Sequence, residues 1–448
     1  MTHPGKLITV HVDATRTFQT IDGFGVNINS RYWDKHLLPA MDLLLNDLGA
    51  TLYRVDIWGK SNWLDPDGSI GRTAALSPEH QSKILDGPVF RRGWGMMRWL
   101  NERGIRPYLT ASGIVPPWML GPDGKTLADF EAFADMMSTM LDWAKRKERL
   151  DFTLFGPLNE TDYGDPEGPT AGPADYVKAC EALDAALTAR GLDDIKLVVA
   201  EQGAFNDEYL APLVASPALH ERLAVFALHD YRDIPESLYR EVTQVAKQSA
   251  HADKPIWMTE FGDLEQSGER EWYVAWVMAS RLFDQLEAGF NAALAWDAYD
   301  NYHDHNEYWT IYGLLRTGLY VYTPKKRYYA MKQVFRFVRP GFQRIAVTCD
   351  DPNLRLLAFT NADRDRVVVA GINAGAIPAR LSVSLVGFAD NVAEGRVACY
   401  RTSETDNCAL TDHAPATARN WPFRGIDACV PPASIFTLTN AGTDPLPG

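Results

Sequence analysis

The stretch DFTLFGPLNE, residues Asp151–Glu160, is an apolar run that ends on an Asn-Glu pair. A short run of this composition is typical of a β-strand that is buried on both faces. It is followed by TDYGDPEGP, whose Asp, Gly and Pro residues predict a loop. The stretch therefore places one carboxylic acid, Glu160, where a buried strand gives way to a loop.

Seven further runs of this kind complete a series of eight. The eight runs are Gly23–Asn29, Ala50–Ile57, Arg106–Ser112, Asp151–Glu160, Ile195–Gly203, Ala224–Tyr231, Pro255–Gly262 and Ala292–Tyr299. Between them lie stretches with apolar residues at helical spacing, such as YVKACEALDAALTARG, which ends in a helix-stopping Arg-Gly pair. The first run carries FGVN and not a GxGxxG phosphate loop, so a dinucleotide site finds no support. The series predicts an α/β protein with a (β/α)8 TIM barrel.

The pattern changes near Arg336–Ile345, after which short alternating strands are separated by turn residues. They include RLLAFTN, RVVVAGINA, ARLSVSLVGF and ASIFTLT, and they predict a C-terminal antiparallel β-sandwich side domain. The early segment KLITVHVD alternates in the same way and has no helix after it, so we expect it to pair with this domain. The expected division is a barrel over 19–337 and a discontinuous sandwich over 1–18 plus 338–448.

Composition narrows the possible partners of the chain. It has 448 residues, 46% hydrophobic and 23% charged, with a formal net charge of −14. This charge argues against nucleic acid as a partner, because a phosphate backbone requires a basic face. A neutral substrate such as a sugar remains compatible. No segment approaches the roughly 20 apolar residues of a membrane span. The oligomeric state is not indicated.

The N-terminal segment and the cysteine spacing give information about the cellular compartment. MTHPGKLITVHVDATRTF reads as a β-strand and not as the core of a signal peptide, so we expect a cytoplasmic protein. The 5 cysteines show no CxxC spacing, which disfavours a zinc knuckle. We expect mostly buried, reduced thiols, with a Cys399–Cys429 or Cys408–Cys429 bridge left open.

Catalytic groups of a (β/α)8 barrel come from the C-terminal ends of its strands. The candidates there are Arg54 and Asp56, Asn159 and Glu160, Glu201, His229 and Tyr231, Glu260, and Trp296 and Asp297, with Trp118 after the third strand. Two carboxylic acids can cleave a glycosidic bond, one protonating the leaving oxygen and the other attacking or activating water. Aromatic side chains stack on the apolar faces of sugar rings, so these residue types together indicate carbohydrate chemistry.

The motifs FQTIDGFGVN, PPWM, LNE and TEFG, in this order, resemble those of retaining glycoside hydrolases with catalytic glutamates on strands 4 and 7. The chain is most similar to glycoside hydrolase family 30, whose members include glucosylceramidases, xylanases and β-1,6-glucanases. YYAMKQVFRFVRPGFQRI resembles that family's crossing from barrel to sandwich, and PPASIFTLT its closing strand. The resemblance covers nearly the whole chain and implies a retaining β-glycosidase that needs no metal or other cofactor.

The resemblance also implies roles for single residues. Glu160 matches the acid/base and Glu260 the nucleophile. Asn159 matches the residue that binds the sugar hydroxyl next to the anomeric carbon, Arg54 an arginine that pairs with the nucleophile, and Tyr231 a tyrosine that contacts it. His229, Trp118, Trp296 and Asp297 are expected to contribute to substrate binding.

Three alternatives remain beside this hypothesis. Each candidate could be structural, with Glu160 a solvated loop residue, Arg54 a partner in an ion pair and His229 a core histidine. The chain could be a metal-dependent barrel hydrolase. Such an enzyme would need a His-x-His motif at the end of the first strand, where this chain has VNIN. The loop motif His303-Asp304-His305 could bind zinc, but no third ligand for it is apparent. The chain could also be a non-catalytic sugar-binding protein.

Overall fold

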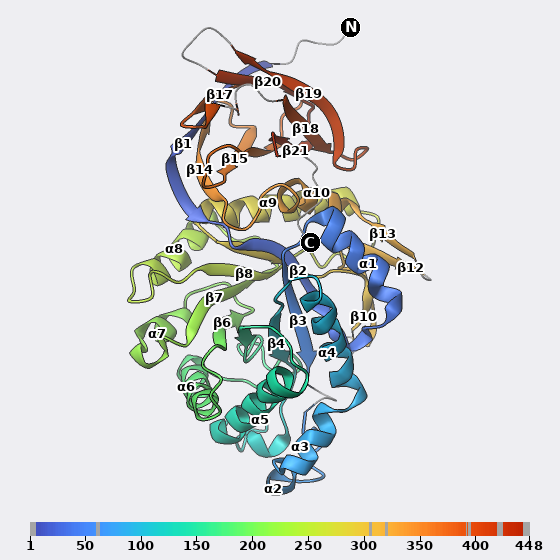
Figure 1. The fold of residues 1–448 in the computed structure, drawn as a ribbon, viewed down its shortest axis with the longest axis vertical. Coiled ribbons are helices and arrows are strands. Elements are labelled where there is room, and N and C mark those ends of the chain that lie inside the picture. Colours follow the sequence, from blue (N-terminus) through green and yellow to red (C-terminus); the bar gives the residue numbers. More distant parts are fainter. Residues whose placement is uncertain are drawn as a thin grey trace.

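The eight apolar runs form one closed parallel barrel whose strands follow one another in chain order (Figure 1). The computed structural model describes residues 6–59, 63–303, 307–318, 321–390, 392, 396–418 and 424–441. The barrel strands are β2 (Gly23–Asn29), β3 (Leu52–Trp58), β4 (Tyr108–Ser112), β5 (Leu154–Gly156), β6 (Lys196–Gln202), β7 (Leu223–Asp230), β8 (Ile256–Phe261) and β9 (Ala292–Ala295). The expected (β/α)8 barrel is confirmed.

Helices cover the outside of this barrel because their apolar faces must be buried against the strands. The described helices are α1 (Leu38–Asp42), α2 (Arg72–Ala75), α3 (Pro78–Leu85), α4 (Pro88–Asn101), α5 (Phe130–Asp142), α6 (Pro173–Ala189), α7 (Leu210–Ala215), α8 (Glu236–Lys247), α9 (Glu271–Ala288) and α10 (Lys326–Phe335). The expected helix stop after α6 is present, since Gly191 follows it with a φ of 65°.

Strand β5 is shorter than its apolar run suggests. It ends at Gly156, and the next residue, Pro157, has no N–H to donate to a sheet. The chain therefore leaves the barrel before Asn159 and Glu160, which lie on a loop. Glu160 adopts a left-handed conformation with a φ of 42°, and its N–H donates to the carbonyl of Glu201 at 2.8 Å.

The long segment after β9 folds into two hairpins. Strands β10 (Asn301–His303) and β11 (Tyr308–Thr310) form the first, and β12 (Leu315–Gly318) and β13 (Val321–Pro324) form the second. The buried ion pair between Lys325, which follows β13, and Asp300, which precedes β10, is 2.7 Å long and ties the two hairpins together. Asp304 and His305, the other members of the suspected His-x-His motif, lie outside the described residues.

The C-terminal strands build a β-sandwich side domain, as expected. Within the described residues its nine strands are hydrogen bonded in the closed order β1-β14-β15-β16-β21-β18-β19-β20-β17. Their bounds are β1 (Lys6–Thr20), β14 (Gln343–Cys349), β15 (Leu354–Thr360), β16 (Val367–Asn373), β17 (Ala379–Val386), β18 (Arg396–Thr402), β19 (Ala409–Ala418), β20 (Arg424–Val430) and β21 (Ser434–Thr439).

Strand β1 joins this sheet on both of its edges (Figure 1). It pairs antiparallel with β14, where Val10 faces Cys349, and parallel with β17, where Val10 faces Val383. The expected pairing of KLITVHVD with strands beyond Phe342 is confirmed. The alternation of the segment explains it, because Ile8, Val10 and Val12 are buried while Thr9 between them is exposed.

Helix α10 connects the barrel to the side domain through a buried polar contact. Gln333 of α10 donates to Thr402 at 2.9 Å, and Thr437 donates to the side-chain oxygen of Gln333 at 2.7 Å. Phe337, just beyond the helix, packs on Tyr400 with ring centroids 4.6 Å apart. The two domains therefore share a packed and hydrogen-bonded contact.

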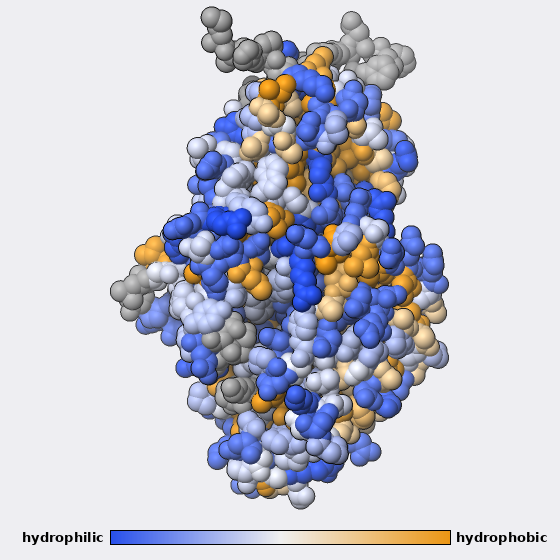
Figure 2. All heavy atoms as spheres, turned by 180° about the vertical axis from the view of Figure 1, so that it is seen from behind, coloured by the Kyte–Doolittle hydropathy of each residue, from blue (hydrophilic) through white to orange (hydrophobic). Residues whose placement is uncertain are grey.

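The outer surface is mostly hydrophilic, with apolar side chains scattered over the face shown in Figure 2, as expected for a chain with 23% charged residues. No helix within the described residues has the length and apolar character that crossing a bilayer requires. Within the same part of the chain the cysteines are thiols and do not form disulfides, so neither of the two bridges left open occurs.

The role of β1 in the side domain can be tested with one pair of substitutions. Val10→Asp places an unpaired carboxylate in the core and should destabilise the protein by about 3–5 kcal/mol. Thr9→Asp, on the exposed face of the same strand, should change stability by less than about 0.5 kcal/mol. Denaturant unfolding followed by circular dichroism measures both. Equal losses for the two variants would mean that β1 does not belong to this core.

Candidate active site

A cavity of about 650 Å³ opens at the C-terminal ends of the barrel strands. Most of the residues singled out from the sequence lie along it. Arg54, Asn159, Glu160, Tyr231, Glu260 and Trp296 are among its lining residues. The fold thus brings together side chains that are separated by up to 242 positions in the chain, as the placement of catalytic groups in barrels predicts.

Glu260 lies at the end of β8, where two donors hold its carboxylate. Arg54 of β3 forms a hydrogen-bonded ion pair with Oε1. The hydroxyl of Tyr231, just after β7, donates to Oε2 at 2.5 Å. Each carboxylate oxygen therefore has its own partner, which fixes the orientation of the group relative to the cavity.

The guanidinium of Arg54 is almost fully buried, with 1% of the residue exposed, and it has several further partners. It donates to the side-chain oxygens of Asn27 at 2.9 Å and Asn159 at 2.7 Å. It also lies 3.4 Å from the carboxylate of Glu201. Although burial alone would lower it, the negative charges of Glu201 and Glu260 raise the pKa of Arg54. A permanent cation thus occupies the centre of the site.

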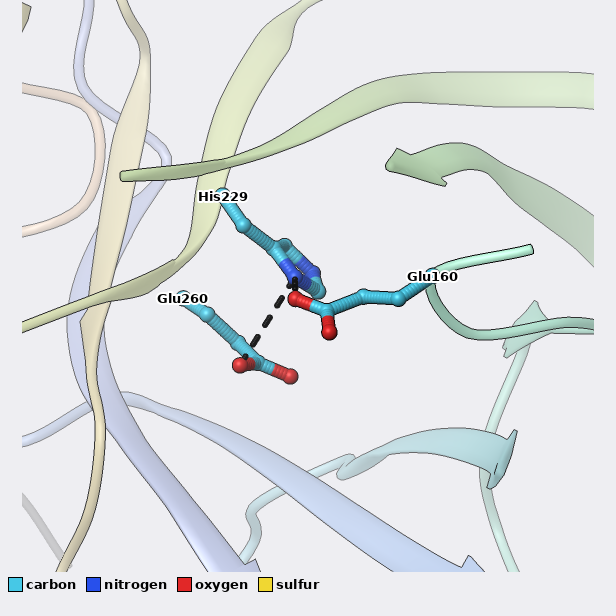
Figure 3. Close-up of side chains that lie close together, drawn as sticks. All are labelled: Glu160, His229 and Glu260. Carbon is cyan, nitrogen blue, oxygen red and sulfur yellow. Dashed lines mark hydrogen bonds and ion pairs between the residues drawn. The ribbon is translucent and has the colours of Figure 1, made fainter. Parts of the chain in front are cut away.

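Glu160 faces Glu260 from the loop after β5 (Figure 3). Burial raises the pKa of Glu160 above the usual range of a glutamic acid, although its hydrogen bond to His229 opposes this shift. Within the set of Glu160, His229 and Glu260, one donor atom from each residue lies within 4.8 Å of the others. The two carboxyl groups therefore approach each other closely across the cavity.

His229 of β7 contacts three carboxylates, and Figure 3 shows two of them, Glu160 and Glu260. Its Nδ1 lies 2.6 Å from Oε1 of Glu160 and 3.7 Å from Oε2 of Glu260, and its Nε2 lies 2.8 Å from Oε2 of Glu201. Burial alone would lower the pKa of His229, but the charge of Glu260 and the hydrogen bonds to Glu160 and Glu201 raise it to about 10. The imidazole is therefore a buried cation whose two nitrogens both donate.

Glu201 at the end of β6 contacts both cations of the site, Arg54 and His229. It is completely buried and also accepts a hydrogen bond from the hydroxyl of Thr259 at 2.7 Å. Burial would raise its pKa, yet the charge of Arg54 and the hydrogen bond from His229 lower it. Glu201 is thus a carboxylate that positions the two cations. From the sequence it was only a candidate at the end of a strand.

Of the expected substrate-binding residues, His229 contacts the lining residues Glu160 and Glu260 without lining the cavity itself, and two others lie farther from it. The indole of Trp118 donates to Asp65 at 2.9 Å, and the carboxylate of Asp297 accepts from Asn301 at 2.8 Å. Neither is among the described residues that line the cavity. Both side chains hold neighbouring loops in place, which a strand-end position alone could not reveal.

The cavity contains two further carboxylic acids, Asp56, which was a candidate from the sequence, and Glu167, which was not. Asp56 shares a face of β3 with Arg54, since alternate strand residues point the same way, and Ser112 donates to it at 2.5 Å. Burial raises the pKa of Asp56 to about 6. Glu167 reaches the cavity from the loop after β5. No periodic pattern marks a loop residue, so the sequence offered no signal for it.

The cluster of Glu160, His229 and Glu260 has the spacing of a metal site but not its chemistry. A metal ion binds the lone pair of a neutral imidazole. Both nitrogens of His229 already lie within hydrogen-bonding distance of the carboxyl groups of Glu160 and Glu201. The donor set therefore fits a proton network better than a divalent cation.

Comparison with known proteins supports the fold. No model of a known protein family matches the chain. The family 30 subfamily 8 xylanase Xyn30A from Clostridium acetobutylicum superposes with a TM-score of 0.72 at 19% identity, over 96% of this chain and 99% of that one. The endo-β1,6-glucanase BT3312 gives a TM-score of 0.66 at 18% identity, over 97% of this chain and 94% of that one.

A third similar structure belongs to another family. The family 39 β-xylosidase from Caulobacter crescentus has a TM-score of 0.63 at 16% identity, over 96% of this chain and 99% of that one. The expected likeness to family 30 glycoside hydrolases is thus confirmed at the level of the fold, barrel and side domain together. At these identities the likeness speaks for the fold and not for the activity.

The charge of His229 gives a pH-dependent contribution to stability. A histidine whose pKa is raised on folding stabilises the native state below its unfolded pKa of about 6.5, and the contribution is lost as the pH rises through about 10. We expect the difference in unfolding free energy between the wild type and His229→Gln to shrink over this interval. Urea unfolding at several pH values measures it, with the exposed His36→Gln as control. A difference that is constant from pH 6 to 10 would contradict a buried cation.

Proposed function

We propose that the protein is a retaining β-glycosidase that acts by double displacement. The observation that carries the proposal is the pair of glutamates in the barrel cavity, which differ in environment. Glu260 is held as a carboxylate partner by Arg54 and Tyr231, whereas burial raises the pKa of Glu160. A carboxylate that two donors hold, next to a carboxyl group whose pKa is raised, suits one nucleophile and one acid.

In the first step, a carboxylate oxygen of Glu260 attacks the anomeric carbon while Glu160 donates its proton to the leaving oxygen. The glycosidic bond breaks, and a covalent glycosyl ester forms on Glu260. In the second step, Glu160 removes a proton from water, and this water attacks the same carbon and releases Glu260. Two inversions at one carbon return the β configuration.

The distance between the two glutamates supports this mechanism over single displacement. Retaining enzymes place their carboxyl groups about 5–5.5 Å apart, whereas inverting enzymes need about 6.5–9.5 Å to admit a water molecule. One carboxyl oxygen of Glu160 lies within 4.8 Å of one carboxyl oxygen of Glu260, which agrees with the shorter of the two separations.

His229 and Arg54 have complementary tasks in the proposed cycle. When Glu260 becomes an ester it loses its negative charge, and the buried cations next to it then favour the ionised form of Glu160. Glu160 would thereby change from acid to base between the two steps. In this proposal the loss of negative charge on Glu260 is enough to lower the pKa of Glu160, so the change from acid to base does not depend on a movement of the protein.

The substrate in this proposal is a neutral carbohydrate. Trp58, Tyr231, Trp296 and Tyr312 line the cavity, and aromatic rings of this kind stack on sugars. The similar structures carry the names of a xylanase, an endo-β1,6-glucanase and a β-xylosidase, which supports a β-linked sugar but not one particular linkage. A panel of β-linked disaccharides and polysaccharides with product analysis would identify it.

The two glutamates can be distinguished by the leaving group. On an unactivated β-glycoside, Glu160→Gln and Glu260→Gln should each lower kcat by at least about 10²–10⁴-fold. On a 2,4-dinitrophenyl β-glycoside, whose leaving group needs no proton, Glu160→Gln should still release a burst of dinitrophenolate, and Glu260→Gln should not. Glu208→Gln, an exposed glutamate, is the control. Wild-type activity in either catalytic variant would refute that residue's role.

The stereochemical outcome tests the mechanism independently. Double displacement predicts that the β-anomer is the first product released from a β-glycoside, before mutarotation. Proton NMR spectra recorded in the first minutes of hydrolysis measure the ratio of the anomers. The α-anomer as first product would show that Glu260 activates water and does not attack the sugar.

A further inference from the structure

Glu167 lies on the loop after β5, and this loop folds back onto the proposed acid. The carbonyl of Glu160 accepts hydrogen bonds from the N–H groups of Tyr163 at 2.9 Å and Gly164 at 3.1 Å. The N–H of Glu167 then donates to the carbonyl of Gly164 at 2.8 Å. These bonds turn the chain back to the cavity, where Glu167 is a lining residue beside Glu160.

The backbone of Glu167 is held from two further directions. Its carbonyl accepts a hydrogen bond of 2.7 Å from Gly113, which follows β4. The next residue, Gly168, packs directly on Asn159, because a Cβ at Gly168 would lie only 2.7 Å from the carbonyl oxygen of Asn159. Glu167 is thus positioned by its backbone, and replacement of its side chain should leave the loop in place.

The side chain of Glu167 meets the amide of Asn159. Arg54 can only donate hydrogen bonds, so the atom of Asn159 that it contacts at 2.7 Å must be the oxygen. The amide nitrogen therefore points the other way, and it lies 3.4 Å from Oε2 of Glu167. Together, Asn159 offers a donor and Glu167 a carboxyl group on the same side of the cavity.

This side can be related to the sugar ring through Glu260. One carboxylate oxygen of Glu260 faces Arg54, which connects to Asn159, and the other faces Tyr231. A sugar whose anomeric carbon lies over Glu260 has two ring neighbours to that carbon, C2 with its hydroxyl and the ring oxygen. A ring oxygen only accepts hydrogen bonds, whereas a hydroxyl both donates and accepts. The combination of donor and carboxyl therefore suits C2.

We propose that Glu167 is a specificity-determining residue that binds the C2 hydroxyl of the sugar in the cavity, together with Asn159. The inference rests on the proposed β-glycosidase function and adds a contact that selects among substrates. A sugar without a hydroxyl at C2, or with a bulky substituent there, would lose this contact or collide with the loop. The selected class is that of β-glycosides with a free C2 hydroxyl.

The electrostatic surroundings of Glu167 agree with this role. Burial and the negative charges of Glu160, Glu260 and Asp56 raise the pKa of Glu167 to about 8. Near neutral pH the side chain is therefore a neutral carboxylic acid, which can both donate to and accept from a hydroxyl group. It does not add a further negative charge beside the proposed acid.

The test compares two substrates that differ only at C2. The probes are the 4-nitrophenyl β-glycoside that the wild type cleaves fastest among glucoside, galactoside and xyloside, and its 2-deoxy counterpart. We expect Glu167→Ala to lower kcat/KM for the 2-hydroxy substrate roughly 10-fold or more and to affect the 2-deoxy substrate less than about 3-fold. The higher intrinsic reactivity of 2-deoxy glycosides does not affect the result, because the ratio of kcat/KM for the two substrates is compared between the wild type and the variant.

Two further variants separate recognition from loop structure. Glu167→Gln keeps the size and a hydrogen-bonding group, so it should restore part of the preference for the 2-hydroxy substrate. Asp162→Asn weakens the loop where Asp162 accepts from the N–H groups of Gly203 and Ala204, and it should affect both substrates by the same factor. An unchanged ratio in both Glu167 variants would overturn the inference. A wild type that cleaves neither these glycosides nor any β-linked disaccharide or polysaccharide of the panel would overturn the proposed function as well.

Discussion

The guanidinium of Arg54 is the group on which the geometry of the barrel mouth depends. It is buried, and it donates to Asn27 on β2 and Asn159 after β5 while it pairs with Glu260 on β8. A buried arginine is costly unless carboxylates and carbonyl oxygens compensate its charge and its donors. Here the compensating groups are those proposed to bind and attack the substrate. The need to satisfy one cation thereby fixes the positions of residues from two strands and one loop.

A second cation completes the balance of charge. Glu160, Glu201 and Glu260 converge on His229, and three carboxylates without this imidazolium would repel one another in a site of low polarity. Two cations against three acids leave one carboxyl group that is most easily protonated. Glu160 is the one whose pKa burial raises, whereas Arg54 and His229 lower the pKa of Glu201. The difference between an acid and a nucleophile thus follows from which carboxyl lies nearest to the permanent charge.

Much of this arrangement could be predicted from the sequence, because barrel strands are continuous apolar runs and the residues that follow each run can be identified. Glu260, Arg54 and Tyr231 were found in this way. The exact end of β5 was not, since apolar content does not reveal that Pro157 stops the strand before Glu160. Trp118 and Asp297 were assigned to the substrate because of their positions alone, yet hydrogen bonds to Asp65 and Asn301 engage them. Such contacts depend on the path of the loops, and loops show no repeating pattern of apolar residues from which this path could be predicted.

Glu167 illustrates the same limit with a functional consequence. Its place in the cavity results from hydrogen bonds between loops after two different strands and from the close packing of Gly168 on Asn159. The same short loop carries Glu160, whose left-handed backbone and bond to Glu201 fix the direction of its side chain. Acid and recognition residue therefore share one support. A change in this loop should therefore alter the proposed acid and the proposed sugar contact together, and Arg54, which binds both Asn159 and Glu260, connects the same loop to β8.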